Sequence, residues 1–196
     1  MSTRKKAKVL GRGHQRRSPA RVLALVLAAG VVLLLAGMTW LGLAGRDSGY
    51  ALGSRRYDPE TRIQQTELVP EFRNGKVYVD LSTIKEKAIV RFEIPNQPVT
   101  LPNGSTFDSL PITAYVAPSG RLVAAVSFCE PCSGTTFHIQ GDRLVCNVCG
   151  TQWKLEDLRG IYGGCLMYPP DEVKYQVEDG KLVLDEQGLR SWQPRM

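Results

Sequence analysis

The sequence predicts an all-β domain tethered to a membrane by one N-terminal helix, and three observations support this fold class. Residues 22–45 form an apolar run of 24 residues without a charged side chain. After Gly75, apolar and polar residues alternate in several short segments, and this period of two is typical of β-strands. Turn-forming Gly, Pro, Asn and Asp residues separate these segments at short intervals.

The apolar run Val22–Gly45 predicts a transmembrane helix. At ~1.5 Å per helical residue it would extend about 36 Å, which is enough to cross a hydrocarbon core of ~30 Å. Eight basic residues precede it, and only Arg46, Arg55 and Arg56 lie soon after it. The positive-inside rule then places the N-terminus in the cytoplasm and the following domain outside it. A cleaved signal peptide is the alternative, but the run exceeds the ~7–15 apolar residues of a signal sequence.

The formal net charge of +6 over 196 residues comes from the N-terminal tail. Residues 1–46 contain nine Lys and Arg and no acidic residue, whereas the remainder carries 16 basic against 19 acidic residues, a net charge of −3. The folded part therefore offers no basic surface for nucleic acid, and we expect no nucleic-acid partner. Residues 1–21 are interpreted as a basic cytoplasmic tail.

The pattern after the apolar run predicts three further parts. Residues 46–74 are mixed and polar, and are expected to form a linker with a short helix near residues 61–68. The β domain is expected at residues 75–187, and residues 188–196 are expected to form a C-terminal tail. Strands are predicted at 76–81, 88–94, 111–116, 121–128, 136–139, 143–146, 151–155, 173–177 and 181–184.

All five cysteines lie between Phe128 and Pro170, and four of them form two Cys-x-x-Cys pairs. The first pair is Cys129 and Cys132, and the second is Cys146 and Cys149. A predicted hairpin turns at Gln140–Asp142 between the pairs, so the two loops should lie side by side. Four thiolates brought together in this way suit either an iron–sulfur centre or a structural zinc ribbon.

The alternatives to a metal site are weaker. Disulfides are common outside the cytoplasm, but five is an odd number of cysteines and adjacent Cys-x-x-Cys pairs are a poor staple for a domain of this size. A thioredoxin-type pair opens a helix, whereas Cys132 is followed by a Ser-Gly turn and β-branched residues. The sequence shows no Ser-His-Asp set and no paired carboxylates, so it does not indicate a hydrolase.

Two further side chains near the paired cysteines have open interpretations. Cys165 follows Gly163 and Gly164, which would allow a close backbone approach to a cluster, but a small buried residue in a tight turn is the simpler interpretation. His138 lies on a predicted strand, with five residues between it and the nearest cysteine, and is expected to be an exposed or core histidine rather than a ligand.

The second half of the chain shows a loose resemblance to Rieske domains. Cys146, Cys149 and Gly150 are followed by Gly163-Gly164 and by a predicted terminal hairpin near Gly180, which is the order of the second ligand loop and hairpin in that family. Cys149 and Cys132 stand where Rieske proteins have histidine ligands. The resemblance implies a small β domain, Rieske-like or zinc-ribbon-like, in which thiolates replace those histidines.

The chain more closely resembles the FtrD-like family of membrane iron–sulfur proteins. The matching features are a strand into Cys129, the Gly141-Asp142 hairpin leading to Cys146, the second pair, and Gly163-Gly164-Cys165 before prolines; the resemblance extends from about Val77 to Leu184. It implies an iron–sulfur centre with ligands Cys129, Cys132, Cys146 and Cys149, and with Cys165 as a fifth ligand or close neighbour. After Cys165 the family often has Asn-Pro, whereas this chain has Leu166-Met167-Tyr168-Pro169.

The resemblance also implies a function. We expect an electron carrier rather than a stand-alone enzyme, anchored in the cell membrane by one span, with its domain extracytoplasmic. Its partner would be a membrane protein of iron uptake or respiratory electron transfer, and the carrier would exchange one electron at a time. The alternative is a zinc-ribbon module that binds a protein partner without redox chemistry.

Overall fold

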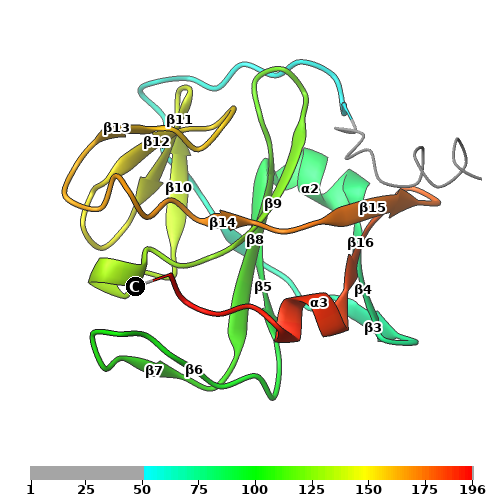
Figure 1. Cartoon of the computed structure of the whole chain (residues 1–196). Coiled ribbons are helices and arrows are strands. Elements are labelled where there is room, and N and C mark those ends of the chain that lie inside the picture. Colours follow the sequence, from blue (N-terminus) through cyan, green and yellow to red (C-terminus); the bar gives the residue numbers. More distant parts are fainter. Residues whose placement is uncertain (1–50, 196) are drawn as a thin grey trace, which may run out of the picture. The chain divides into compact units, whose positions relative to one another are not determined.

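The computed structural model describes residues 51–195, which fold mostly into β-structure (Figure 1). Their strands form several hydrogen-bonded sheets that are predominantly antiparallel, so the predicted β character of the domain is confirmed. Between residues 51 and 195 no helix is both long and apolar enough to cross a membrane. The predicted span Val22–Gly45 and the predicted tail at residues 1–21 lie outside the described residues.

The central sheet has the strand order β14-β9-β8-β5-β2. Its strands are β14 (Asp171–Glu172), β9 (Leu122–Val126), β8 (Leu110–Val116), β5 (Ile89–Ile94) and β2 (Thr66–Glu67). Strand β2 runs parallel to β5, and the other pairs are antiparallel. The predicted turn between β8 and β9 is present, and Gly120 occupies it with φ +92°, a conformation that glycine adopts without strain.

A second sheet, with the order β1-β10-β11-β12-β13, contains Cys146 of the second pair. Its strands are β1 (Ile63–Gln64), β10 (Phe137–Gln140), β11 (Arg143–Cys146), β12 (Gln152–Lys154) and β13 (Gly160–Tyr162). Strands β10 and β11 form the predicted hairpin, in register from Phe137 opposite Cys146 to Gln140 opposite Arg143. Strand β11 therefore delivers Cys146 at the end of the hairpin that is remote from its turn.

The remaining elements are a third sheet, a short β-hairpin, two short helices and a 3-10 turn. They are β3 (Glu71–Arg73), β4 (Lys76–Asp80), α2 (Leu81–Lys87), β6 (Val99–Thr100), β7 (Thr106–Phe107), a 3-10 turn η1 (Glu130–Cys132), β15 (Tyr175–Glu178), β16 (Lys181–Asp185) and α3 (Glu186–Arg190). Strands β15, β16, β4 and β3 form a third sheet, and β6 pairs with β7. The predicted terminal hairpin is the pair β15 and β16.

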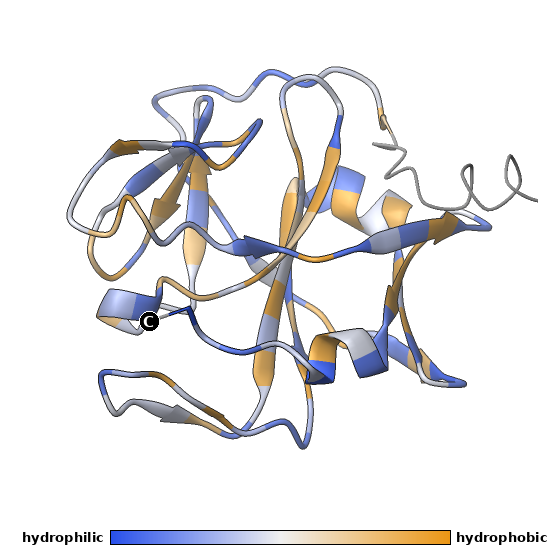
Figure 2. Ribbon diagram, in the orientation of Figure 1, coloured by the Kyte–Doolittle hydropathy of each residue, from blue (hydrophilic) through white to orange (hydrophobic). Residues whose placement is uncertain are grey.

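Two apolar cores lie on opposite faces of the central sheet. Alternate residues of β5, such as Val90 and Phe92, pack into the core shared with α2, β4 and β16. The neighbouring Ile89, with Tyr115 of β8, packs into the core that includes Cys129, Cys146 and Cys165. Burial on both faces explains why β8 and β9 are continuous apolar strands, which appear as hydrophobic bands in the middle of Figure 2.

The short helix predicted near residues 61–68 is wrong, because the chain forms β1 and β2 there. Gln65, between the two strands, explains the difference. Its side-chain oxygen accepts a hydrogen bond from the backbone N–H of Phe137 at 2.8 Å, and its amide nitrogen donates to Thr113 Oγ1 at 2.9 Å. These partners lie 72 and 48 residues away, so long-range pairing overrides local helix preference here.

Candidate metal centre

The first cysteine pair lies where β9 ends and the chain turns through η1. Pro131 occupies an early position of this 3-10 turn, where its missing N–H costs no hydrogen bond. Ser133 has φ 57° at the end of the turn and lets the chain reverse. The loop is then closed by the Cys129 N–H, which donates to the Gly134 carbonyl at 2.7 Å, and by the Cys132 N–H, which donates to the Cys129 carbonyl at 3.2 Å.

The second pair lies in the tight turn that follows β11. The Gly150 N–H donates to the Cys146 carbonyl at 3.0 Å, and Gly150 has φ +71°. The turn is joined to the first loop, because the Asn147 N–H donates to the Thr136 carbonyl at 3.0 Å. The hairpin thus brings the two Cys-x-x-Cys loops to one end of the domain, as the spacing predicted.

Cys165 is brought to the same place by a close approach of two backbone segments. Gly163 lies against Thr151, where an added Cβ would come within 2.5 Å of the Thr151 hydroxyl. The Cys165 N–H donates to this hydroxyl at 3.2 Å. One residue later, the Leu166 carbonyl accepts a hydrogen bond from the indole of Trp153 at 3.2 Å. The Gly163-Gly164 turn therefore folds over the second loop.

The sulfur atoms of all five cysteines form one cluster, and each cysteine is free of disulfide bonds. Cys129 Sγ lies 3.8 Å from Cys149 Sγ, and Cys149 Sγ lies 3.9 Å from Cys165 Sγ. Cys132 Sγ lies 3.7 Å from Cys146 Sγ. The sulfurs of Cys129, Cys132, Cys149 and Cys165 all lie within 4.8 Å of one another. The structure thus places Cys165 inside the tightest group and Cys146 beside it.

The cluster is buried on one side and open on the other. Cys129, Cys146 and Cys165 are buried, Cys132 is half-buried, and Cys149 is exposed. The buried sulfurs belong to the second apolar core, whose largest side chains include Phe137 and Trp153 in edge-to-face contact, with ring centroids 6.1 Å apart. The surrounding core lowers the local dielectric, and Cys149 is where the cluster meets the surface.

Proton sharing among the thiols separates their pKa values. A hydrogen bond from Cys129, followed by backbone N–H groups of Cys149 and Val148, lowers the pKa of Cys146 to about 5. The same contact with Cys146, reinforced by burial, raises the pKa of Cys129 well above its ordinary value. Burial raises the pKa of Cys132 to about 12. In the metal-free cluster these shifts favour a thiolate at Cys146 and retain the protons of Cys129 and Cys132.

His138 is not part of the sulfur cluster. It is buried on β10, and its Nδ1 lies 2.6 Å from Asn147 Oδ1, while Asn147 Nδ2 donates to Gln64 Oε1 at 3.1 Å. Its Nε2 has no hydrogen-bond partner in the described structure. His138 therefore supports the backbone of the second loop through Asn147 rather than joining the sulfurs.

Two residues that the sequence did not single out shape the cluster. Gly134 lies against it so closely that an added Cβ would come within 2.7 Å of Cys146 Sγ and 3.2 Å of Cys132 Sγ. The hydroxyl of Thr151 lies 3.2 Å from Cys149 Sγ. Their positions are a partial signal, since each follows a Cys-x-x-Cys pair by two residues.

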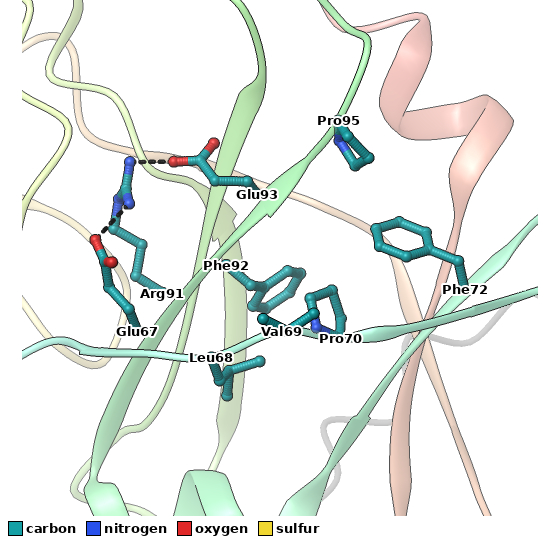
Figure 3. Close-up of a pocket in the computed structure, with 9 residues that line it drawn as sticks. All are labelled: Glu67, Leu68, Val69, Pro70, Phe72, Arg91, Phe92, Glu93 and Pro95. Carbon is teal, nitrogen blue, oxygen red and sulfur yellow. Dashed lines mark hydrogen bonds and ion pairs between the residues drawn. The ribbon is translucent and has the colours of Figure 1, made fainter.

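A pocket of about 390 Å³ lies elsewhere in the domain, between the segment around Pro70 and strand β5 (Figure 3). Phe72, Phe92 and Pro95 give it apolar walls. Its two carboxylates, Glu67 and Glu93, both pair with Arg91, the former at 2.9 Å. With these charges already matched, the pocket has no set of free ligands comparable to the cysteine cluster.

An all-sulfur donor set is the one that iron–sulfur centres use, and buried thiols with nearby N–H groups suit their ligation. The residues present therefore fit such a group. Residues 100–196 match the family model described as "Membrane iron-sulfur containing protein FtrD-like". No curated protein and no solved structure matches the chain. The family description and the gathered cysteines confirm the expected iron–sulfur cofactor.

Proposed function

Residues 100–196 belong to the FtrD-like family of membrane iron–sulfur proteins, and from this premise we propose that the chain is a membrane-anchored electron carrier. The observation that carries the proposal is the convergence of five free cysteine sulfurs on one partly exposed site. An iron–sulfur centre held there would supply one-electron redox chemistry. The cysteines of the two loops, Cys129, Cys132, Cys146 and Cys149, are its proposed ligands, with Cys165 as a fifth ligand or close neighbour.

The chain's own residues bind, orient and insulate the centre. Backbone N–H groups of Cys149 and Val148 point to the Cys146 sulfur, and the Gly134 N–H points to the Cys132 sulfur. Such donors favour the thiolate form and stabilise added negative charge, so they set the reduction potential. The apolar core behind the site excludes water from the buried sulfurs.

The exposed side of the cluster is the proposed route for electrons. Cys149 is the exposed cysteine, and the neighbouring Val148 side chain is 63% exposed. Two more exposed apolar side chains, Tyr162 and Met167, flank Cys165 along the chain. A partner that docks over Cys149 would contact an apolar surface, and an electron would have its shortest path to the centre there.

The proposed partner is a membrane protein of iron uptake or of a respiratory chain, and the proposed domain side is extracytoplasmic. Support comes from the family description as a membrane protein and from the basic residues that precede Val22. A reporter fused after Met196 should be active only outside the cytoplasmic membrane, and the full chain should fractionate with membranes. Activity of the reporter in the cytoplasm would contradict this topology.

A structural zinc site is the second candidate, and one observation favours it. A tetrahedron of sulfurs at about 2.3 Å from one metal has edges of about 3.8 Å. Three sulfur–sulfur distances in the cluster, 3.7, 3.8 and 3.9 Å, have this length. In that case the domain would be a rigid module for binding a protein partner.

A redox titration of the anaerobically purified full chain tests the proposed function. We expect visible absorption that bleaches on reduction and returns on oxidation in a one-electron step, because iron–sulfur centres absorb visible light and zinc does not. A colourless protein, or colour that does not respond to reductant, would contradict electron transfer and favour the zinc module.

A further inference from the structure

The first cysteine loop contains a buried carboxylate that the proposed function does not use. Glu130 stands between Cys129 and Cys132 in the sequence, its residue exposure is 1%, and its side chain is fully buried. A buried carboxylate is costly unless it is paired and hydrogen-bonded. Its charge also lies beside a site that gathers thiolates, which are themselves anionic.

Arg195 supplies the matching positive charge. Its Nε donates to Glu130 Oε1 at 2.7 Å, its terminal nitrogen approaches the same oxygen at 2.5 Å, and its backbone N–H donates to Glu130 Oε2 at 2.7 Å. Both carboxylate oxygens are thus bound by one residue that lies 65 positions away. Paired hydrogen bonds between guanidinium and carboxylate fix direction as well as distance.

The same arginine also binds the segment that follows Cys165. Its Nη1 lies 2.7 Å from Asp171 Oδ1, and its Nη2, the nitrogen that approaches Glu130, donates to the Pro169 carbonyl at 2.5 Å. Its guanidinium carbon lies 5.8 Å from the ring centroid of Tyr168. Arg195 therefore joins the loop of the first cysteine pair to the segment that leads away from Cys165.

Trp192 strengthens this connection. Its ring stacks on Phe128, the residue before Cys129, with centroids 5.7 Å apart and planes 19° apart. Its indole N–H donates to Asp171 Oδ2 at 2.9 Å, so the two oxygens of Asp171 hold Trp192 and Arg195 respectively. Residues 192–195 thus form a strap across both segments, held by stacking at one end and by ion pairs at the other.

We propose that Arg195 is a positioning residue for the metal centre, which it serves by fixing the Glu130 loop against the Cys165 segment and by cancelling the Glu130 charge. The expected shift in reduction potential rests on the proposed iron–sulfur centre, whereas the fixing of the Glu130 loop by Arg195 does not. Loss of the arginine would leave Glu130 buried and unpaired, which penalises the folded loop. It would also add an uncompensated negative charge near the centre, which favours the oxidised state.

The test uses three variants of the full chain: Arg195→Gln, Glu130→Gln and the double variant. We expect Arg195→Gln to lower the reduction potential and Glu130→Gln to raise it, because the first makes the site one charge more negative than the parent and the second one charge more positive. The double variant should return the potential toward that of the parent. If the strap had only a packing role, the two single variants would not shift the potential in opposite directions. The absence of opposite shifts would therefore overturn the charge assignment.

A second readout is independent of iron. In urea unfolding of the metal-free protein, Arg195→Gln should lose more stability than the double variant, since the latter leaves no unpaired buried charge. Additive effects of the two substitutions would overturn the coupling between these residues. A chain that holds zinc and no reducible centre would refute the proposed function. The coupling between Arg195 and Glu130 in urea unfolding would still show whether the strap holds the Glu130 loop.

Two controls complete the design. Arg190→Gln removes a positive charge from α3, where Arg190 pairs with Glu186 on the surface, and it should leave the potential unchanged. Arg195→Lys keeps the charge but loses the paired geometry, so it should restore the potential while the centre is still lost faster to a chelator than in the parent. If Arg195→Gln fails to fold, Glu130→Gln and Arg195→Lys still give the sign of the charge effect and the loss of positioning. Equal potentials in all folded variants would overturn the proposal.

Discussion

Gly134 should be important for metal binding because the place where a side chain would begin lies against the sulfurs. In Gly134→Ala the new Cβ would lie 2.7 Å from Cys146 Sγ, 3.2 Å from Cys132 Sγ and 3.3 Å from Val148 Cβ. Non-bonded carbon contacts are comfortable at about 3.5–4.0 Å, so the Cys146 sulfur would have to shift by roughly 1 Å. Overpacking of this kind costs about 1–3 kcal/mol.

If this strain falls on the metal-bound form, it corresponds to binding weaker by a factor of about 5 to about 150, at 1.4 kcal/mol per tenfold change. Cobalt(II) titration of the metal-free protein, followed by thiolate-to-cobalt absorption, measures the loss. Gly164→Ala is the matched control, because no atom lies within 4 Å of its added Cβ although it precedes Cys165. Equal cobalt affinity in the two variants would refute the proposed close packing at Gly134.

Further predictions concern individual ligands, one hydroxyl and pH. Cys129→Ser should lose metal under either metal assignment, whereas Cys165→Ser should change the visible spectrum or potential of a cluster; a silent Cys165→Ser would favour zinc. Thr151→Val should lower the reduction potential, since it removes a hydroxyl 3.2 Å from Cys149 Sγ, and Thr151→Ser should not. The apparent metal affinity should rise with pH, because bound metal must displace the protons that Cys129 and Cys132 retain; stopped-flow proton release at pH 7 would show none if these thiols were already ionised. In the metal-free protein, the lowered pKa of Cys146 contributes stability that is present above the ordinary thiol pKa of 9.0 and is lost as the pH falls through about 5. The raised pKa of Cys132 contributes stability that is present below pH 9.0 and is lost as the pH rises through about 12. Urea unfolding measured across this pH range would reveal both losses of stability.

Local patterns were sufficient for the longer strands and for the meeting of the cysteine loops, but not for the short strands such as β1 and β2. The alternation in β4 and β5, the apolar run in β8 and the turn residues between β10 and β11 are signals within a few residues of one another, and the structure has strands at these places. Helix α2 was missed, although Leu81 and Ile84 lie three residues apart and are both buried. A helix of seven residues between two strands is too short for its period to be distinguished.

Contacts between distant segments could not be predicted from the sequence. Glu130 looked like an ordinary polar residue of a turn, and only the fold reveals Arg195 beside it. The same holds for Gln65, whose partners lie in two other strands. Sequence spacing indicated that Cys165 would approach the site, but its contact with Cys149 depends on the packing of Gly163 against Thr151.

The measurement that tests the central claim most directly is the iron, zinc and acid-labile sulfide content of the anaerobically purified full chain. An iron–sulfur centre in the cysteine cluster predicts that iron and sulfide are both present, and that both are lost in Cys129→Ser. One zinc per chain without sulfide, again lost in Cys129→Ser, would contradict the electron-carrier account and identify the cluster as a structural zinc site.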